Sequence, residues 1–246
     1  MNNMRIVIIA DIHGNLAALQ AVLADARLHG GIDVLWCLGD LVGYGPQPGD
    51  CIETIGGLNA VVIAGNHDRG AIGKLNTSYF NPAAAEVLQW TAEQLTPAQA
   101  DYLGRLPLIM EYEQFLLVHG SPSDPLLEYI LSAGIAERNF DLHAFKYCMA
   151  GHSHIPVAFR NEDDGGKPIG LQPGVGLVLG DRRMIVNPGS VGQPRDGDPR
   201  ASYGVYDTEA NMFRLQRVEY DIQATQDAMM AAGLPIRLIT RLGQGR

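Results

Sequence analysis

The chain has 246 residues, of which 46% are hydrophobic and 18% are charged, so it can bury a large core and is too apolar to be disordered. The formal net charge of −9 argues against non-specific binding to nucleic acid or anionic membranes, because that binding depends on clustered Lys and Arg. The three cysteines are odd in number and widely spaced, which favours neither a disulfide framework nor a thiolate zinc site.

The first third of the chain alternates strand-like and helix-like segments. Apolar runs with strand character are separated by amphipathic segments, and Gly30-Gly31 is a typical helix stop. This βαβ order predicts a parallel first sheet. The predicted strands lie at residues 5–10, 33–39 and 60–65, and the predicted helices lie at residues 15–29 and 46–55.

The order then changes from βα to ββ. Residues 83–95 and 97–106 are predicted helices with Pro in the first turn, and they would either form a lid or cover one sheet face. Residues 108–112 and 115–118 are predicted to pair as a hairpin. A second, largely antiparallel sheet is expected after residue 154, with a closing helix at 221–232 and frayed last residues. Its predicted strands are residues 157–160, 176–179, 184–186, 203–207 and 212–218.

Five of the apolar runs end in polar side chains that can bind a metal ion. In an open α/β sheet, ligands bind beyond the carboxyl ends of the strands, so these side chains are expected to converge. The pattern predicts a metal-dependent enzyme. The residues are Asp11, His13, Asp40, Asn66, His119, His152 and His154.

Most of the histidines belong to these motifs. Five of the seven do so, since His67 follows Asn66 directly. The other two, His29 and His143, lie in helix-like stretches and are expected at the surface or at the edge of the core. Gly65-Asn66-His67-Asp68 and Gly151-His152-Ser153-His154 are the most telling motifs, because Gly permits a sharp turn where polar groups converge.

The ordered motifs resemble those of the calcineurin-like metallophosphoesterases, and in particular their compact prokaryotic phosphodiesterase branch. That series is Asp-x-His, Gly-Asp, Gly-Asn-His-Asp/Glu, His and Gly-His-x-His, and all five blocks occur between residues 11 and 154. The resemblance implies an α/β fold, a four-layer αββα sandwich of two mixed sheets with flanking helices, in a single domain of residues 1–246. It also implies two metal sites that share Asp40. Asp11, His13, Asp40 and His154 would hold one ion, and Asp40, Asn66, His119 and His152 would hold the other.

Mixed carboxylate, amide and imidazole ligands suit two divalent transition-metal ions, namely Mn²⁺, Fe, Co²⁺, Ni²⁺ or Zn²⁺, better than Ca²⁺ or Mg²⁺. A bridging carboxylate and hydroxide would offset the repulsion between two such cations. A water shared by both metals would lose much of its proton affinity and become the nucleophile for phosphoester hydrolysis. The metals would also neutralise charge that develops on the phosphoryl group.

Further residues are expected to act on the substrate. His67 is not needed as a ligand, so it is free to bind phosphate or to protonate the leaving oxygen, and Asp68 is expected to orient it and raise its pKa. Asn66 and Arg195 are the other predicted substrate contacts. For Arg195, a surface ion pair with Asp196 or Asp198 is an equally weighted alternative. Ser190 has no adjacent His in the sequence, which argues against a serine nucleophile.

One departure from the resemblance bears on the substrate. Protein Ser/Thr phosphatases and dinucleoside tetraphosphatases carry Asp-Arg soon after the bridging Asp, whereas residues 41–45 contain no Arg. Small phosphodiesters are therefore the first choice of substrate. The alternatives are a phosphomonoesterase, a nucleotide pyrophosphatase, a protein Ser/Thr phosphatase, or a non-catalytic scaffold with this fold. The start of the chain has no basic leader, and residues 6–10 are too few for a signal or membrane segment, so a cytoplasmic protein without a membrane partner is expected.

Overall fold

The structure, a computed structural model, describes residues 4–246 and contains two six-stranded sheets. The first sheet has the order β3-β2-β1-β11-β12-β9. The predicted strands β1 (Arg5–Ile9), β2 (Val34–Cys37) and β3 (Ala60–Val62) are parallel. The parallel arrangement ends at β1, which pairs antiparallel with β11. The rest of this sheet is also antiparallel and consists of β11 (Ala201–Asp207), β12 (Met212–Val218) and β9 (Gly176–Val178).

The second sheet has the order β4-β5-β6-β10-β7-β8 and is mixed as well. The predicted hairpin of β4 and β5 is confirmed, and β5, β6 and β10 are parallel. The expectation that the strands after residue 154 form a sheet of their own is wrong, because they are divided between the two sheets. The strands are β4 (Ile109–Tyr112), β5 (Phe115–Val118), β6 (Tyr147–Met149), β7 (Val157–Glu162), β8 (Gly165–Ile169) and β10 (Met184–Asn187).

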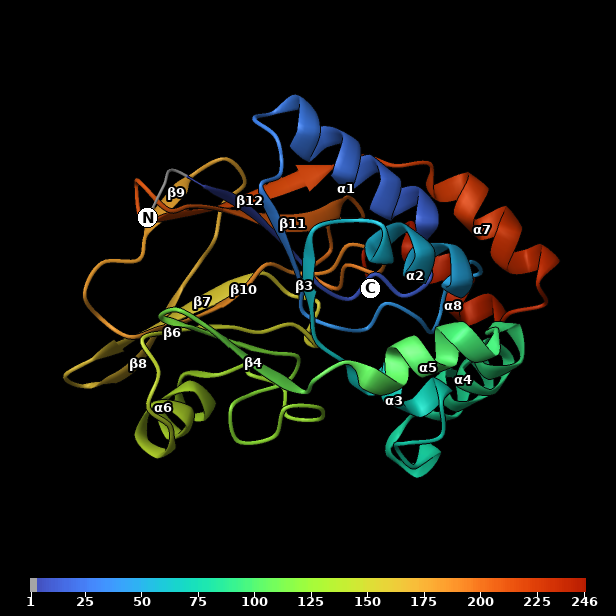
Figure 1. The fold of residues 1–246 in the computed structure, drawn as a ribbon, viewed down its shortest axis with the longest axis horizontal. Coiled ribbons are helices and arrows are strands. Elements are labelled where there is room, and N and C mark those ends of the chain that lie inside the picture. Colours follow the sequence, from blue (N-terminus) through green and yellow to red (C-terminus); the bar gives the residue numbers. More distant parts are fainter. Residues whose placement is uncertain (1–3) are drawn as a thin grey trace.

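Helices cover the outer faces of both sheets, which confirms the four-layer αββα sandwich (Figure 1). On the first sheet, α1 (Leu16–Leu28) packs against β11 and β12, and α2 (Pro48–Gly56) and α7 (Ile222–Ala231) pack beside it. On the second sheet, α6 (Ala133–Leu142) packs against β7 and β8. Alternation along β1 fits this arrangement, since Val7 and Ile9 face the helices while Ile6 and Ile8 face the other sheet.

The remaining helices lie beside the carboxyl ends of the first three strands, at the lower right of Figure 1. The two predicted helices of the middle region are present as α4 (Pro82–Gln94) and α5 (Pro97–Arg105). They follow α3 (Asn66–Ala71) and a single 3₁₀ turn, η1 (Thr77–Tyr79).

The end of the chain was expected to fray but instead forms α8 (Ile236–Leu242). Leu238, Ile239 and Leu242 bury one face of this helix against Met229 of α7 and Val87 of α4. This packing brings the last helix next to the loop that follows β2, since Tyr44 belongs to the same apolar cluster.

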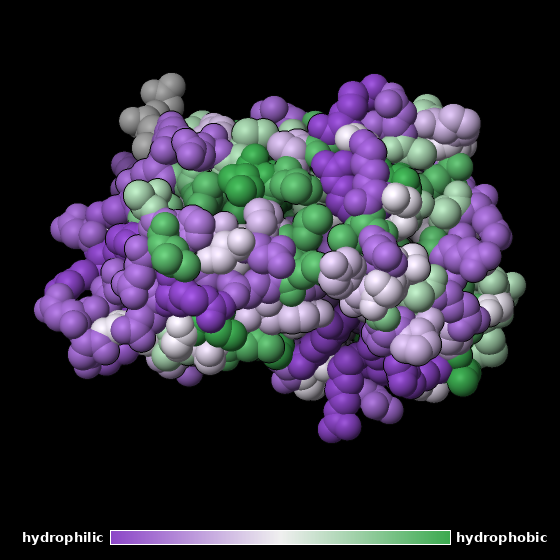
Figure 2. All heavy atoms as spheres, turned by 90° about the horizontal axis from the view of Figure 1, so that it is seen from below, coloured by the Kyte–Doolittle hydropathy of each residue, from purple (hydrophilic) through white to green (hydrophobic). Residues whose placement is uncertain are grey.

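On the face drawn in Figure 2, hydrophobic residues gather near the middle and hydrophilic residues occupy most of the margin. Within residues 4–246, none of the helices has the length and the apolar content needed to span a bilayer.

Candidate metal centre

Seven predicted ligands lie where strands end, and the structure brings their side chains together. In the first sheet, ligands follow β1, β2 and β3, and in the second sheet they follow β5 and β6. None of the seven is more than 5% exposed. The first sheet provides Asp11, His13, Asp40 and Asn66, and the second provides His119, His152 and His154.

Asp11, His13 and His154 form a first group of converging ligand atoms. His154 Nε2 lies 3.1 Å from His13 Nε2 and 3.4 Å from Asp11 Oδ1. The Nδ1 atoms of the two imidazoles face main-chain carbonyls, those of Val42 at 3.1 Å and Gln193 at 2.6 Å. Because these carbonyls accept the Nδ1 protons, each Nε2 has a free lone pair directed at the same point.

His119, His152, Asn66 and Asp40 form a second group. His119 Nε2 lies 3.0 Å from Asn66 Oδ1, 3.1 Å from His152 Nδ1 and 3.3 Å from Asp40 Oδ2. Its Nδ1 lies 2.8 Å from the carbonyl oxygen of Leu38. A single ring nitrogen cannot form a hydrogen bond with all three neighbours, whereas a cation among them would accept all four lone pairs.

Asp40 lies between the two groups. Its Oδ1 accepts a hydrogen bond from the main-chain N–H of His67 at 2.8 Å. Its Oδ2 is buried, lies 3.6 Å from His13 Nε2 and 3.3 Å from His119 Nε2, and has no hydrogen-bond partner among residues 4–246. Leaving a buried carboxylate oxygen unsatisfied is unfavourable. The residues present therefore fit divalent cations bound through oxygen and nitrogen.

The backbone is strained at the same positions. Five of the predicted ligands adopt left-handed backbone conformations, with φ between 51° and 65°, which is uncommon for residues other than Gly. These ligands are Asp11, His13, Asp40, His152 and His154. Close approach also requires glycine, because a Cβ on Gly65 would lie 2.0 Å from Asp40 Oδ1. The Gly-containing motifs thus allow the loops after β2 and β3 to meet.

The carboxyl and imidazole groups shift one another's pKa values in opposite directions. Burial raises the pKa of Asp11 to about 7, although His119 opposes this effect. Burial disfavours the charged form of His119, but Asp40 outweighs it and raises the pKa of His119 to about 9. Burial also disfavours ionised Asp40, yet His119 and His67 outweigh it and hold the pKa of this carboxyl far below its usual range. Asp40 is therefore the negative centre of the cluster.

A cavity of about 170 Å³ opens beside the second group. Asn66, His67 and His152 line this cavity, together with the aromatic side chains of Tyr44 and Tyr129. The ring of Tyr129 stacks on that of His152, with the centroids 3.9 Å apart. His67 Nδ1 is buried without a hydrogen-bond partner in the described part of the chain. Burial lowers the pKa of His67 to about 4, so the imidazole is neutral at neutral pH.

Asp68 does not contact His67 in the way that their adjacency suggested, and the expected rise in the pKa of His67 is not found. The Asp68 carboxylate accepts hydrogen bonds from four main-chain N–H groups at 2.8–3.2 Å, those of Asp40, Leu41, Val42 and Gly65. Both residues belong to α3, where side chains two positions or fewer apart do not face each other. Asp68 instead fixes the backbone that carries Asp40.

Arg195 is half-buried, and its Nη2 donates to Gln193 Oε1 at 3.0 Å. The alternative of an ion pair with Asp196 or Asp198 is wrong, because Arg217 pairs with Asp196, and Arg200 pairs with Asp198 at 2.6 Å. A second guanidinium, that of Arg241 in α8, donates to the same Gln193 oxygen. Sequence reasoning missed Arg241, which belongs to no motif and lies far along the chain.

Three residues given no catalytic role lie apart from the ligand atoms. Ser190 is buried and its hydroxyl donates to the main-chain carbonyl of Asp11 at 2.8 Å, so it supports the backbone of a predicted ligand. His29 lies 3.1 Å from Asp25, and His143 lies 3.1 Å from the hydroxyl of Ser123. Both histidines are away from the two groups.

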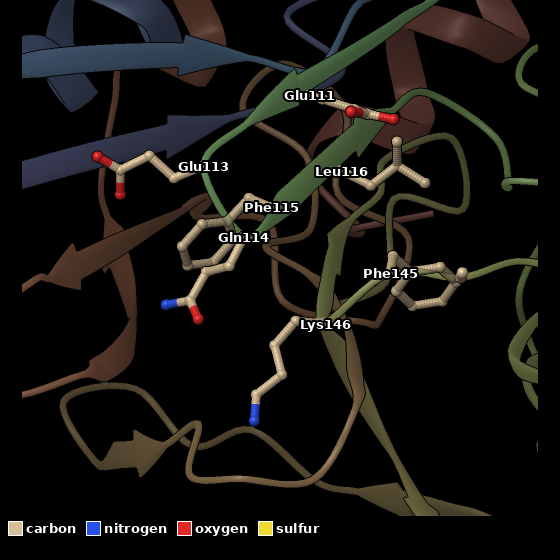
Figure 3. A pocket seen from close by; sticks show the side chains of 8 residues that line it. Glu111, Glu113, Gln114, Phe115, Leu116, Phe145 and Lys146 are labelled. Atoms are coloured by element: carbon tan, nitrogen blue, oxygen red, sulfur yellow. The ribbon is translucent and has the colours of Figure 1, made fainter.

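A separate hollow of about 140 Å³ lies at the amino ends of β5 and β6 in the second sheet (Figure 3). It borders the first residue of β5, Phe115, and the residue before β6, Lys146, whereas the ligands follow the other ends of these parallel strands. The side chains of Glu111, Glu113 and Lys146 point in different directions (Figure 3). Their polar groups do not converge, so this hollow is no second candidate for catalysis.

Comparisons with known proteins agree with this geometry. Residues 4–211 match the family described as the calcineurin-like phosphoesterase superfamily domain. The crystal structure of a metallophosphoesterase from Sphaerobacter thermophilus is 44% identical, with a TM-score of 0.91 and 100% coverage of both chains. An uncharacterized protein of Methanocaldococcus jannaschii is 38% identical over 98% of each chain. A symmetrical bis(5'-nucleosyl)-tetraphosphatase of Vibrio cholerae is 32% identical over 47% of this chain and 44% of its own length.

Proposed function

This chain belongs to the calcineurin-like phosphoesterase superfamily and is a metal-dependent phosphoester hydrolase, and we propose that it cleaves small phosphodiesters at a centre of two metals. The observation that carries the proposal is the Asp40 carboxylate, whose unpaired Oδ2 faces one imidazole of each ligand group. One carboxylate between two convergent groups can offset the repulsion between two neighbouring cations, which supports the proposal.

The residues divide into two overlapping ligand sets. Asp11, His13 and His154 would hold one cation and Asn66, His119 and His152 the other, with Asp40 shared. Two divalent cations, of the Mn²⁺, Fe, Co²⁺, Ni²⁺ or Zn²⁺ class, would supply an activated water and positive charge for the phosphoryl oxygens. The nitrogen-rich ligand set supports this class of metal.

His67 and Asn66 line the cavity and would act on the substrate there. Because burial keeps His67 neutral, its N–H would donate a hydrogen bond to a phosphoryl oxygen and hold it for in-line attack. Tyr44 and Tyr129 also line the cavity and would shield part of the ester group from bulk water. A cavity of about 170 Å³ suits a small phosphoester better than a protein segment.

A nucleotide pyrophosphatase is the second candidate. The match to the tetraphosphatase of Vibrio cholerae favours it, although that match covers less than half of either chain. Both candidates share the same metal chemistry and differ in what the phosphoryl group is bonded to.

The test is a phosphoester panel measured in Mn²⁺, together with the metal content of the purified protein. We expect two metal ions per chain and a higher kcat/KM for bis-nitrophenyl phosphate than for nitrophenyl phosphate. A single ion in a fully occupied protein would contradict the two-metal proposal. A preference for the monoester or for phosphopeptides would contradict the choice of substrate and leave the family assignment intact.

A further inference from the structure

Two guanidinium groups lie over the same tyrosine at the margin of the metal centre. Tyr44 follows Asp40 by four residues, and its ring centroid lies 4.7 Å from that of His13 and 4.4 Å from that of His67. The Cζ atoms of Arg195 and Arg241 lie 5.8 Å and 4.8 Å from the Tyr44 centroid. Arg195 comes from the loop after β10, whereas Arg241 comes from α8, which lies beyond the residues that match the family.

Neither guanidinium has a carboxylate within 4 Å in the described chain. Both donate to one neutral acceptor, Gln193 Oε1, and the Nε of each is buried without a partner. A guanidinium has five N–H donors, and none of the donors of this pair has a carboxylate acceptor in the described part of the chain. The nearby Asp196 does not meet this need, because it pairs with Arg217.

Two like charges in a half-buried position are unfavourable unless an anion joins them. Burial, and after it the charge of Arg195, lowers the pKa of Arg241, which indicates that the two cations act on each other. An anion placed between them would relieve the repulsion and satisfy several donors at once. Bidentate recognition of this kind is what guanidinium groups provide for phosphate.

The pair is also close to the substrate cavity. Tyr44 lines that cavity together with His67 and Tyr129. Burial raises the pKa of the Tyr129 hydroxyl, and the nearby charge of Arg195 opposes this rise. The protein lacks an Arg in residues 41–45, directly after Asp40, and the two guanidiniums approach this same loop from elsewhere in the chain.

We propose that Arg195 and Arg241 form a subsite for a second phosphoryl group, which adjoins the phosphoryl group bound at the Asp–His cluster. The inference rests on the metal-dependent hydrolysis of the proposed function, and it favours the second candidate named there, because compounds with two neighbouring phosphoryl groups, such as nucleoside diphosphates and their esters, contain a phosphoanhydride. Arg241 is then a specificity-determining residue contributed by the last helix.

A purely structural role is the competing explanation, since a guanidinium over Tyr44 would also anchor α8 by a cation–π contact. The two roles predict different effects in two measurements. An anchoring contact affects the thermal stability of the protein, whereas an anion subsite binds phosphate even when the metals have been removed.

The test uses the full chain after treatment with a chelator, titrated with inorganic phosphate by calorimetry or by ³¹P line broadening. We expect phosphate to bind, and we expect R241A and R195A to weaken binding by about 10- to 100-fold through loss of charge-assisted bonds. The matched control is R237A, which removes an exposed Arg from the same helix and should weaken phosphate binding far less, because the charge of Arg237 acts on Arg241 more weakly than that of Arg195 does.

A second measurement uses the Mn²⁺-loaded enzyme. In R241A, kcat/KM for ADP should fall by about tenfold or more relative to kcat/KM for bis-nitrophenyl phosphate, while R237A should keep the ratio. The inference is overturned if the chelated protein binds no phosphate, if R241A and R237A behave alike, or if R241A lowers only the melting temperature. Intact phosphate binding without any hydrolysis would instead contradict the proposed function.

Discussion

Replacing Asp68 by Asn should destabilise the protein through its backbone contacts. The two oxygens of Asp68 accept four main-chain hydrogen bonds, two on Oδ1 and two on Oδ2. Asn keeps only one oxygen, so two N–H groups lose their acceptor and face an NH₂ group instead. A buried donor without a partner costs about 1–3 kcal/mol. We therefore expect D68N to lower the free energy of unfolding by about 2–6 kcal/mol, a large share of the stability of a typical domain.

The measurement is urea unfolding followed by tryptophan fluorescence, with D207N as the matched control. Asp207 also accepts two main-chain hydrogen bonds, at 3.0 Å each, but both reach the single oxygen Oδ1, which Asn retains. D207N should change the free energy of unfolding by less than about 0.5 kcal/mol.

D68N also tests whether Asp68 positions Asp40 or takes a direct part in catalysis. Asp68 is not among the residues that line the cavity, so its loss should act through Asp40, by weakening metal binding. We expect high Mn²⁺ to restore much of kcat in D68N. Wild-type stability in D68N would refute the backbone argument, and a loss of kcat that persists at saturating Mn²⁺ without a loss of stability would indicate a direct catalytic role.

Four further predictions concern the predicted ligands and His67. D40N should keep the fold but weaken metal binding by about 10²-fold or more, because removing one partner of a buried charge pair costs about 3–5 kcal/mol. Isothermal titration with Mn²⁺ measures this affinity, and an unchanged affinity would refute the prediction. H67A should slow alkyl and nitrophenyl esters to a similar extent, by about 10- to 100-fold, as loss of a hydrogen bond to phosphate predicts; a much larger loss for alkyl esters would show proton donation instead. Metal affinity should rise with pH by about tenfold per unit between pH 7 and 9 and then level off, because Mn²⁺ displaces a proton from His119, whose pKa is raised to about 9. In the chelated protein, the free energy of unfolding should instead fall as the pH rises. The stability that protonated His119 gives is complete below the pKa of this residue in the unfolded chain and is lost as the pH rises through about 9. Unfolding measured at several pH values would show this loss.

The convergence of the candidate ligands was predictable from the sequence, because each follows an apolar run and the topology of parallel strands brings such positions to one end of a sheet. Local patterns do not reveal which strands pair. β11 joins β1 although about 200 residues separate them, so the division of the late strands between the sheets was missed. Adjacency in sequence also misled, since His67 and Asp68 lie in one helix and point apart. Arg241 carries no local signal, and only the packing of α8 brings it to Tyr44.

Because each sheet supplies part of the ligand set, metal affinity should report on how well the two sheets fit against each other. Phe213 of the first sheet and Met184 of the second are fully buried between them and are not ligands. Trimming either side chain would allow the sheets to shift, which would misalign the ligand groups without altering any of them. Bound metal would in turn resist separation of the sheets at the carboxyl ends of these strands. Local opening of the sandwich should then start at the other end, near the first residues of β5 and β6, where the amide hydrogens of these strands would exchange fastest.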